Sequence, residues 1–234
     1  MKTVVVNNEA ATTELVRPWR GLSPQQRVDE RRARLLTAAL EVFSAQGFHG
    51  SKVRDVCRAA GLTERYFYES FTGKQALLIA LAEQLVADLV TAAAPGIALV
   101  ETDLDAAVGV IAEAVVGSLT DDPRRARILF VEVVGVSTEI EDRRRVIIAA
   151  LADVVRQGAA RAFGPWVLRS VELELMSRAL IGAAQELLVA YVRDELPLDR
   201  SALVEIFGRL LAQVGPTVEA MAEQQSVNEE RTPS

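Results

Sequence analysis

The chain has 234 residues, half of them apolar, so it is long enough for one large or two small domains around a packed core. Its longest apolar runs, such as VIIAALA at 146–152, are too short to span a membrane, and its first 21 residues lack the apolar stretch of a secretory signal. The single cysteine excludes an internal disulfide, and one cysteine with one histidine argues against a metal site, so we expect a cytoplasmic protein without metal or cofactor.

The net charge of −6 is unevenly distributed along the chain. Residues 17–75 contain 11 Arg or Lys and 6 Asp or Glu, whereas the remaining residues contain 15 and 26. A basic segment attached to an acidic body is typical of a small nucleic-acid-binding domain joined to a second domain. Chance clustering on a solvated helix is the alternative that charge alone leaves open.

The chain shows no alternation of period two and is dominated by Ala, Leu, Arg and Glu, which predicts an all-α fold. Residues 1–24 are expected to form a flexible arm. Gly47 and Gly61 are predicted to end the first two helices, and Ser51 and Thr63 to cap the starts of the second and third. The first four helices are expected at 25–46, 52–60, 64–71 and 74–93.

After Pro95 the apolar segments become longer. Pro123, which follows two aspartates, marks a helix start because proline and acidic side chains suit the first turn. The polar end of the chain is expected to be disordered. The later helices are expected at 103–119, 121–134, 139–163, 168–194 and 200–221. The predicted organisation is an arm at 1–24, a small domain at 25–74, a larger helical domain at 75–222 and a disordered tail at 223–234.

Two short helices joined through AAGLT form a candidate helix-turn-helix. In the second of them, Phe67 and Phe71 are four residues apart and share one face, which we expect to pack inward. Arg65, Tyr66 and Tyr68 would then face outward. An α-helix fits the major groove of DNA, where arginine can bind guanine and tyrosine can contact phosphate or a thymine methyl group.

Residues 31–81 resemble the TetR family of bacterial transcriptional regulators. The resemblance is carried by LLTAALEVFSAQGF, VRDVCRAAGLT and FYESFTGKQAL, which occur in the family's order and spacing. It implies a three-helix DNA-binding domain at 25–74. It also implies that the larger domain at 75–222 binds a small-molecule effector and forms the dimer.

The resemblance implies roles for single positions as well. Ser51 matches the residue whose hydroxyl caps the second helix and touches phosphate, and Tyr68 matches a phosphate-binding tyrosine. Arg65 and Tyr66 lie on the base-reading face. Lys74 matches the lysine that opens the fourth helix, where a free N–H and a positive charge favour phosphate. The candidate DNA-binding residues are Ser51, Lys52, Arg54, Thr63, Arg65, Tyr66, Tyr68 and Lys74.

Two positions depart from the family pattern. Glu64 stands where a small or basic residue is frequent, and Ser70 stands where a histidine is frequent. Other interpretations of the outward residues also remain. Arg65 could pair with Glu69, four residues on, and Tyr68 could simply cover an apolar rim.

The larger domain is expected to surround an apolar cavity, because 104–116, 128–136 and 146–155 are rich in aliphatic residues. The expected effector is therefore largely apolar, and Arg127 or Arg178 could contact an anionic head group such as that of a fatty acid or its thioester. Ordinary core packing is the alternative role for each candidate. The candidate effector-binding residues, chosen by position, are Phe130, Glu132, Trp166, Met176 and Gln185.

The last two helices match the dimer-forming pair of the family. The segment LIGAAQELLVAY contains small residues that allow close helix approach, and LVEIFGRLLAQV adds large apolar side chains. Packing within one chain is the alternative. The candidate interface residues are Gly182, Ala183, Ile206, Phe207 and Leu210.

These observations predict a ligand-responsive transcriptional regulator, most simply a repressor. A homodimer would bind a palindromic double-stranded DNA operator and release it when an apolar small molecule binds. The alternatives are a transcriptional activator and an architectural DNA-binding protein without an effector. An enzyme fits the sequence poorly, because it has one histidine, one cysteine and no Gly-rich phosphate loop, and no catalytic residue is predicted.

Overall fold

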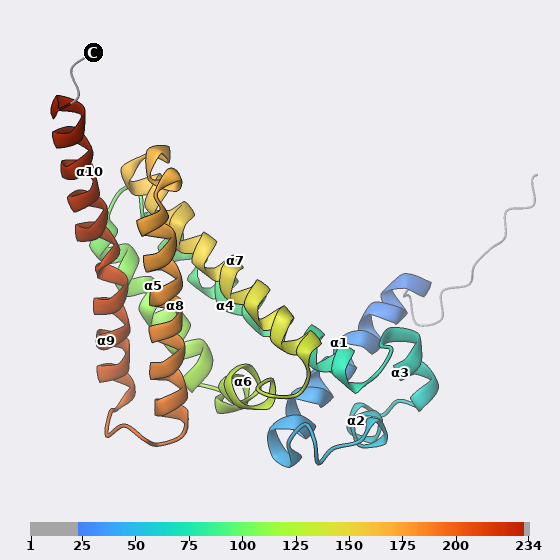
Figure 1. Cartoon of the computed structure of the whole chain (residues 1–234). Helices are drawn as coiled ribbons and strands as arrows, with labels where there is room; N and C mark the ends of the chain where they lie inside the picture. The colour runs from blue at the N-terminus through green and yellow to red at the C-terminus, as the bar shows by residue number, and fades with distance from the viewer. Residues whose placement is uncertain (1–22, 232–234) are drawn as a thin grey trace, which may run out of the picture.

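The computed structural model describes residues 23–231 and shows only helices in that range, which confirms the all-α fold. The predicted arm lies outside the described residues except for its last two positions. Figure 1 shows the small N-terminal domain at one side of the longer helices of the body.

The N-terminal helices are α1 (Pro24–Gln46), α2 (Val53–Ala60) and α3 (Glu64–Ser70), and α4 (Lys74–Leu99) connects them to the body. The body contains α5 (Leu104–Thr120), α6 (Pro123–Arg127), the π-helical turn η2 (Ile128–Glu132), α7 (Thr138–Phe163), the 3₁₀ turn η3 (Pro165–Arg169), α8 (Val171–Val192), α9 (Arg200–Ala212) and α10 (Val214–Arg231).

Local signals set the ends of the N-terminal helices. Ser23 and Gln26 cap the start of α1 reciprocally, because the Ser23 N–H donates to the Gln26 side chain at 2.7 Å and the Gln26 N–H donates to the Ser23 hydroxyl at 3.1 Å. Gly61 ends α2 in the left-handed conformation, with φ 63° and ψ 37°. Glycine adopts this conformation without the steric cost of a Cβ, which explains the turn between α2 and α3.

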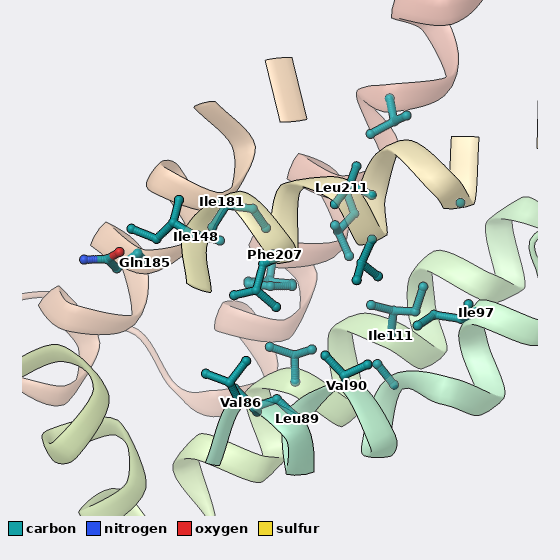
Figure 2. A pocket seen from close by; sticks show the side chains of 18 of the residues that line it. Val86, Leu89, Val90, Ile97, Ile111, Ile148, Ile181, Gln185, Phe207 and Leu211 are labelled. Atoms are coloured by element: carbon teal, nitrogen blue, oxygen red, sulfur yellow. The ribbon is translucent and has the colours of Figure 1, made fainter. Parts of the chain in front are cut away.

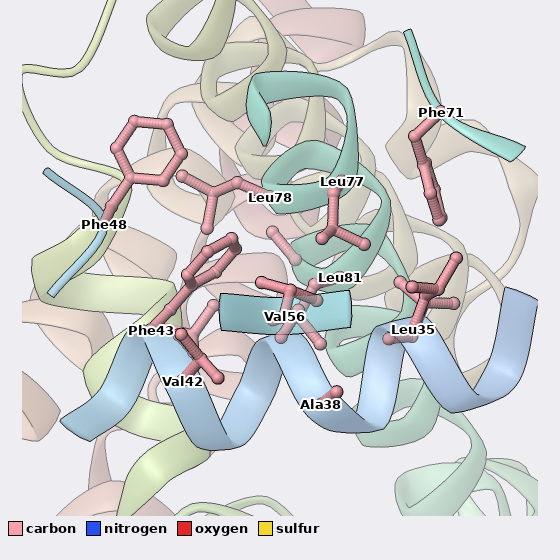
Figure 3. Close-up of a cluster of buried hydrophobic side chains, with 14 of the residues drawn as sticks. Leu35, Ala38, Val42, Phe43, Phe48, Val56, Phe71, Leu77, Leu78 and Leu81 are labelled. Carbon is pink, nitrogen blue, oxygen red and sulfur yellow. The ribbon is translucent and has the colours of Figure 1, made fainter. Parts of the chain in front are cut away.

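The core of the N-terminal domain includes the first half of α4. Figure 3 shows Leu77, Leu78 and Leu81 of α4 packed with side chains of α1 and with Val56 of α2. The boundary that we placed between 74 and 75 therefore falls within a helix shared by both domains. A displacement of α4 within the body would reach the helix-turn-helix directly through this core.

Several predicted helix boundaries were wrong. The helix expected at 121–134 is a short α6 followed by η2, and the helix expected at 200–221 is interrupted at Gln213. Pro216 explains the second break, because it lacks an N–H and suits the first turn of a new helix. By contrast, α4 continues through Pro95 to Leu99. The last helix, α10, runs to Arg231 and so extends into the segment that we predicted to be disordered.

By length and composition alone, α4 and α8 are apolar enough to cross a membrane, although their unbroken apolar runs are short. Apolar core helices of soluble proteins have the same property. In this fold α4 contributes its apolar side chains to the N-terminal core and to a cavity in the body. Its composition is therefore accounted for by packing within the protein.

Gly96 allows α4 and α5 to pack closely, and we expect Gly96→Ala to destabilise the body. An added Cβ would lie 2.6 Å from Ile111 Cγ1 and 2.9 Å from the carbonyl oxygen of Ala107, and that backbone atom cannot move away alone. Overpacking of this kind costs about 1–3 kcal/mol. Thermal unfolding followed by circular dichroism should show a melting temperature several degrees lower. Gly109→Ala on α5 is the control, since its Cβ would meet no atom of the described residues within 4 Å, and an equal loss in both variants would contradict the prediction.

Candidate DNA-binding surface and effector cavity

The aromatic residues of α3 divide between the core and the surface as predicted. Phe67 is fully buried and Phe71 nearly so, whereas Tyr66 is partly exposed and the Tyr68 side chain is 58% exposed. The rings of Phe67 and Tyr68 meet edge to face at 5.2 Å between centroids. The two phenylalanines therefore anchor the helix, and the two tyrosines remain available at the surface.

Arg65 forms the ion pair that we considered as an alternative to DNA contact. Its Nε lies 3.3 Å from Glu69 Oε1, and Arg31 approaches the other Glu69 oxygen at 3.6 Å. The Arg31 guanidinium also lies over the Tyr66 ring, 4.6 Å from its centroid. Because the Arg65 side chain is 85% exposed, the pair is worth little and a phosphate or base could replace Glu69 at low cost. The pair is thus compatible with a DNA-binding role.

Two residues that were predicted to contact phosphate have hydrogen-bond partners inside the protein. Ser51 is buried, and its hydroxyl donates to the Phe48 carbonyl at 2.9 Å instead of capping α2. The cap of α2 is Lys52, whose N–H donates to the Asp55 carboxylate at 3.0 Å. The Lys74 ammonium donates to the carbonyls of Phe48 at 2.5 Å and Ser51 at 2.7 Å. Burial lowers the pKa of Lys74.

The lysine therefore ties the start of α4 to the turn before α2, and its side chain is already engaged within the protein. The first backbone N–H groups of α4 could still face a phosphate, because no side chain of residues 23–231 caps them. Lys52, Arg54 and Thr63 are exposed, as a DNA-contacting role requires. Cys57 is buried, and burial together with the nearby Glu64 carboxylate raises the pKa of its thiol, which favours a packing role.

The body contains a cavity of about 630 Å³, a volume within the range of small-molecule sites. Figure 2 shows aliphatic side chains from α4, α5, α7 and α8 pointing into it, together with Phe207 and Leu211 of α9. Leu129, Phe130 and Val133, in and beside η2, complete the wall nearest the N-terminal domain. The labelled lining residues are Val86, Leu89, Val90, Ile97, Ile111, Ile148, Ile181, Gln185, Phe207 and Leu211.

The predicted effector residues fall into two groups. Phe130 and Gln185 line the cavity, whereas Glu132, Trp166 and Met176 do not. The Trp166 indole N–H donates to the Phe163 carbonyl at 2.8 Å, and both Trp166 and Met176 pack against a separate apolar cluster. Position along the chain had suggested these residues, but the helix faces on which they lie point elsewhere.

The arginines that line the cavity are not the two that the sequence suggested as contacts for an anionic ligand. Arg127 pairs with Glu132 at 3.0 Å and Arg178 pairs with Glu174 at 3.2 Å, and neither lines the cavity. Arg143 and Arg144 of α7 do line it. Arg143 pairs with Glu83 of α4, and Arg144 pairs with Glu141 at 3.2 Å. The sequence DRRR at 142–145 reads as a solvated face, so only the packing of α7 against α4 reveals that two of these arginines border a cavity.

The candidate interface residues also differ in their surroundings. Gly182 and Ala183 are exposed on α8, and Ile206 and Leu210 are half-buried on α9. Phe207 is buried in the core of its own chain and lines the cavity, so its assignment to a dimer interface was wrong. The exposed face of α8 also contains Val171 and Leu175, which were not among the predicted interface residues.

Known proteins resemble this chain both locally and over most of its length. Residues 35–81 match the family described as "Bacterial regulatory proteins, tetR family". The HTH-type transcriptional activator FasR of Mycolicibacterium smegmatis is 24% identical over 177 residues, which are 76% of this chain and 79% of that protein.

Solved structures show the same fold. The fatty acid degradation regulator FadR of Bacillus halodurans aligns with a TM-score of 0.64 and 19% identity over 77% of this chain and 94% of its own. FadR of Bacillus subtilis in complex with stearoyl-CoA aligns with a TM-score of 0.65 and 17% identity over 78% and 96%. With its helix-turn-helix domain, its larger helical body and the matched segment, the chain belongs to the TetR family of bacterial transcriptional regulators.

Proposed function

We propose that the protein is a cytoplasmic, dimeric regulator that binds a palindromic DNA operator and releases it when an acyl ligand fills the cavity of the body. The observation that carries this proposal is the apolar cavity, whose wall includes α4 and η2 next to the helix-turn-helix domain. An enzyme is not proposed, because the matched relatives are transcription regulators.

A long acyl chain with an anionic head group is the ligand class that suits the lining best. Most of the wall is aliphatic, so binding would come mainly from burial of apolar ligand surface, about 25 cal/mol per Å². The FadR structure of Bacillus subtilis, which has the same fold, contains stearoyl-CoA. We therefore assign long-chain acyl-CoA thioesters, or the free acids, as the effector class.

The charged residues of the wall indicate the direction in which such a ligand would lie. Arg143 and Arg144 are at the end where α7 meets Glu83 of α4. Asp105 of α5 and Glu219 of α10 also line the cavity. The starts of these two helices are neighbours, since an added Cβ on Gly215 would lie 3.6 Å from Leu104. An anionic head group is attracted to the first end and repelled from the second. We expect the head group at the arginines and the methyl end of the chain toward α10.

The direct test begins with selection of bound sites from random DNA duplexes by the full-length protein. Acyl-CoA thioesters of increasing chain length are then titrated against the protein by calorimetry and against the protein–operator complex. Each added methylene contributes about 0.8 kcal/mol, so the affinity should rise about fourfold per carbon until the cavity is full. Operator release by sugars or nucleotides alone, with no response to any acyl chain, would refute the assignment.

Activation is the second candidate, because the relative that matches over most of this chain is named a transcriptional activator. In that case the acyl ligand would strengthen operator binding. The sign of the change in operator affinity on adding the ligand distinguishes the two directions, and a reporter gene behind the selected site gives the transcriptional outcome.

Arg65→Ala is expected to relax sequence preference at one position of each operator half-site. A side chain that reads a base edge contributes about 1–3 kcal/mol of discrimination, whereas a phosphate contact weakens all sites evenly. Binding to a panel of single-base operator variants, measured by fluorescence anisotropy, separates these effects. Glu69→Gln, which frees Arg65 from its ion pair, should keep the parent's preference. If the Arg65→Ala protein ranks the operator variants as the parent does, Arg65 does not read a base.

The exposed apolar face of α8 is the surface that we assign to the homodimer. Val171 and Leu175 are 69% and 63% exposed, and Gly182 and Ala183 continue the same helix. Exposed apolar surface of this kind favours association, and a two-fold dimer would place two recognition helices on a palindromic site.

Leu175→Arg is accordingly expected to yield monomers with at least tenfold weaker operator binding, because it buries unpaired charge at the interface. Light scattering measures the molar mass. The control is Val146→Arg, which places the same charge on an exposed valine of α7 and should leave the dimer intact. If the Leu175→Arg protein is still a dimer, the interface does not lie on this face of α8.

A further inference from the structure

We propose that Glu132 is a positioning residue that couples the cavity to the helix-turn-helix domain through one hydrogen bond to the backbone of Phe48. This inference rests on the proposed function, since it specifies how an occupied cavity would change operator affinity. The sequence suggested Glu132 as a ligand contact, but the structure gives it different partners.

The carboxylate of Glu132 connects two segments that are 84 residues apart. Its Oε2 accepts the Phe48 N–H at 2.7 Å, and its Oε1 accepts the Arg127 Nε at 3.0 Å. The side chain is only 9% exposed. A short, charge-assisted hydrogen bond that is shielded from water holds its partners more firmly than a surface pair does. Glu132 is thus fixed by Arg127 on the body and holds the turn between α1 and α2.

On the DNA-binding side, Phe48 organises that turn. Its carbonyl accepts hydrogen bonds from the Ser51 hydroxyl and the Lys74 ammonium. Its ring packs edge to face against Phe43 at 5.5 Å, and the Lys74 ammonium lies 4.3 Å from the ring centroid. Figure 3 shows Phe48 at the end of the N-terminal core beside Leu78 of α4. A shift of the Phe48 backbone would therefore be transmitted to the start of α2 and to the first turn of α4.

On the cavity side, the neighbours of Glu132 form part of the wall. Leu129 and Phe130 of η2 line the cavity, as does Val133, which directly follows η2. Glu132 is the last residue of η2 and lies between Phe130 and Val133 in the chain. The π-helical turn is a geometry that occurs in short segments and often at functional sites. A ligand that presses on Phe130 and Val133 would shift the backbone segment that carries Glu132 between them. The hydrogen bond to Phe48 would then lengthen, and the α1–α2 turn would be released.

The test compares the full-length parent with Glu132→Ala and Glu132→Gln, with stearoyl-CoA as the probe. Glutamine retains an oxygen that can accept the Phe48 N–H, so it should preserve most of the parent's behaviour. Glu139→Gln is the control for loss of one negative charge, because Glu139 is exposed in the first turn of α7. Operator affinity is measured with and without the probe, probe affinity is measured by calorimetry, and hydrogen–deuterium exchange is followed in the peptide that contains Phe48.

For the parent, we expect the probe to change operator affinity by about 5- to 150-fold, a typical allosteric coupling. Glu132→Ala should bind stearoyl-CoA within about threefold of the parent, yet its ligand-free operator affinity should already match that of the ligand-loaded parent. Adding stearoyl-CoA should then change the operator affinity of this variant by less than about threefold. Exchange in the peptide containing Phe48 should be faster in this variant than in Glu132→Gln.

Two results would overturn the proposal. One is a Glu132→Ala protein with the parent's response to the probe and the parent's exchange at Phe48. The other is a Glu132→Ala protein that no longer binds the probe, which would make Glu132 a ligand contact. If the parent itself ignores stearoyl-CoA, the acyl assignment fails separately. The proposed role of the hydrogen bond between Glu132 and Phe48 is then still tested by two comparisons of Glu132→Ala with the parent. These are the ligand-free operator affinity and the hydrogen–deuterium exchange of the peptide that contains Phe48.

Discussion

Phe67→Ala is expected to remove about 3–5 kcal/mol of folding stability and to abolish specific operator binding. Phe67 is fully buried between Phe71 and the core of the N-terminal domain, and truncation of a buried phenylalanine costs this much because the cavity left behind is only partly refilled. Since α3 has only seven residues, it cannot persist without its anchor. Differential scanning calorimetry should show an earlier unfolding transition, and fluorescence anisotropy should show loss of binding to the selected operator.

The neighbouring residue provides the matched control. Tyr68 is exposed, so Tyr68→Phe removes one hydroxyl and leaves the ring contact with Phe67 in place. Its stability should stay within about 0.5 kcal/mol of the parent's, as for most surface substitutions. Its operator affinity should fall evenly across sites if the hydroxyl bonds a phosphate. Equal stability losses in both variants would mean that α3 does not divide its aromatic residues between anchoring and contact.

Val90→Phe is expected to weaken the binding of long-chain acyl-CoA about 100-fold while leaving ligand-free operator binding unchanged. Val90 points into the cavity beside Ile111 (Figure 2), so a phenyl ring there would occupy the volume that an acyl chain needs. If the ring excludes three or four methylenes at about 0.8 kcal/mol each, the loss is about 2.4–3.2 kcal/mol. Isothermal titration calorimetry with a chain-length series measures both the loss and the shift of the optimum to shorter chains.

Val134→Phe is the control for this variant, because Val134 is exposed and lies outside the cavity wall. It should retain the parent's affinity and chain-length optimum. Val90→Ala enlarges the cavity and should accept longer chains. A Val90→Phe protein that binds stearoyl-CoA as tightly as the parent would place the acyl site elsewhere in the molecule.

Most features of the N-terminal domain could be predicted from local patterns in the sequence. Apolar spacing placed Phe67 and Phe71 inside and the tyrosines outside, and Gly61 marked the left-handed turn between α2 and α3. These features depend on helix periodicity and on backbone preferences of single residues, which act over a few neighbouring positions. The family motif lies in the same stretch, at 35–81.

Long-range packing decided what the sequence did not. Lys74 and Ser51 turned inward because carbonyl groups of the α1–α2 turn lie within their reach, although their positions in the chain had suggested phosphate contacts. Trp166 packs in a separate cluster and Phe207 in the core of its own chain, since the face that a helix presents depends on its neighbours.

The cavity wall and the contact between the two domains were beyond sequence reasoning for the same physical reason. The pattern DRRR at 142–145 is equally compatible with a solvated face and with a cavity rim, and only the crossing of α7 over α4 places Arg143 and Arg144 at the rim. Glu132 meets Phe48 across 84 residues through a single hydrogen bond. Periodicity describes the faces of one helix, whereas a partner so far away in the chain is determined only when the helices pack together.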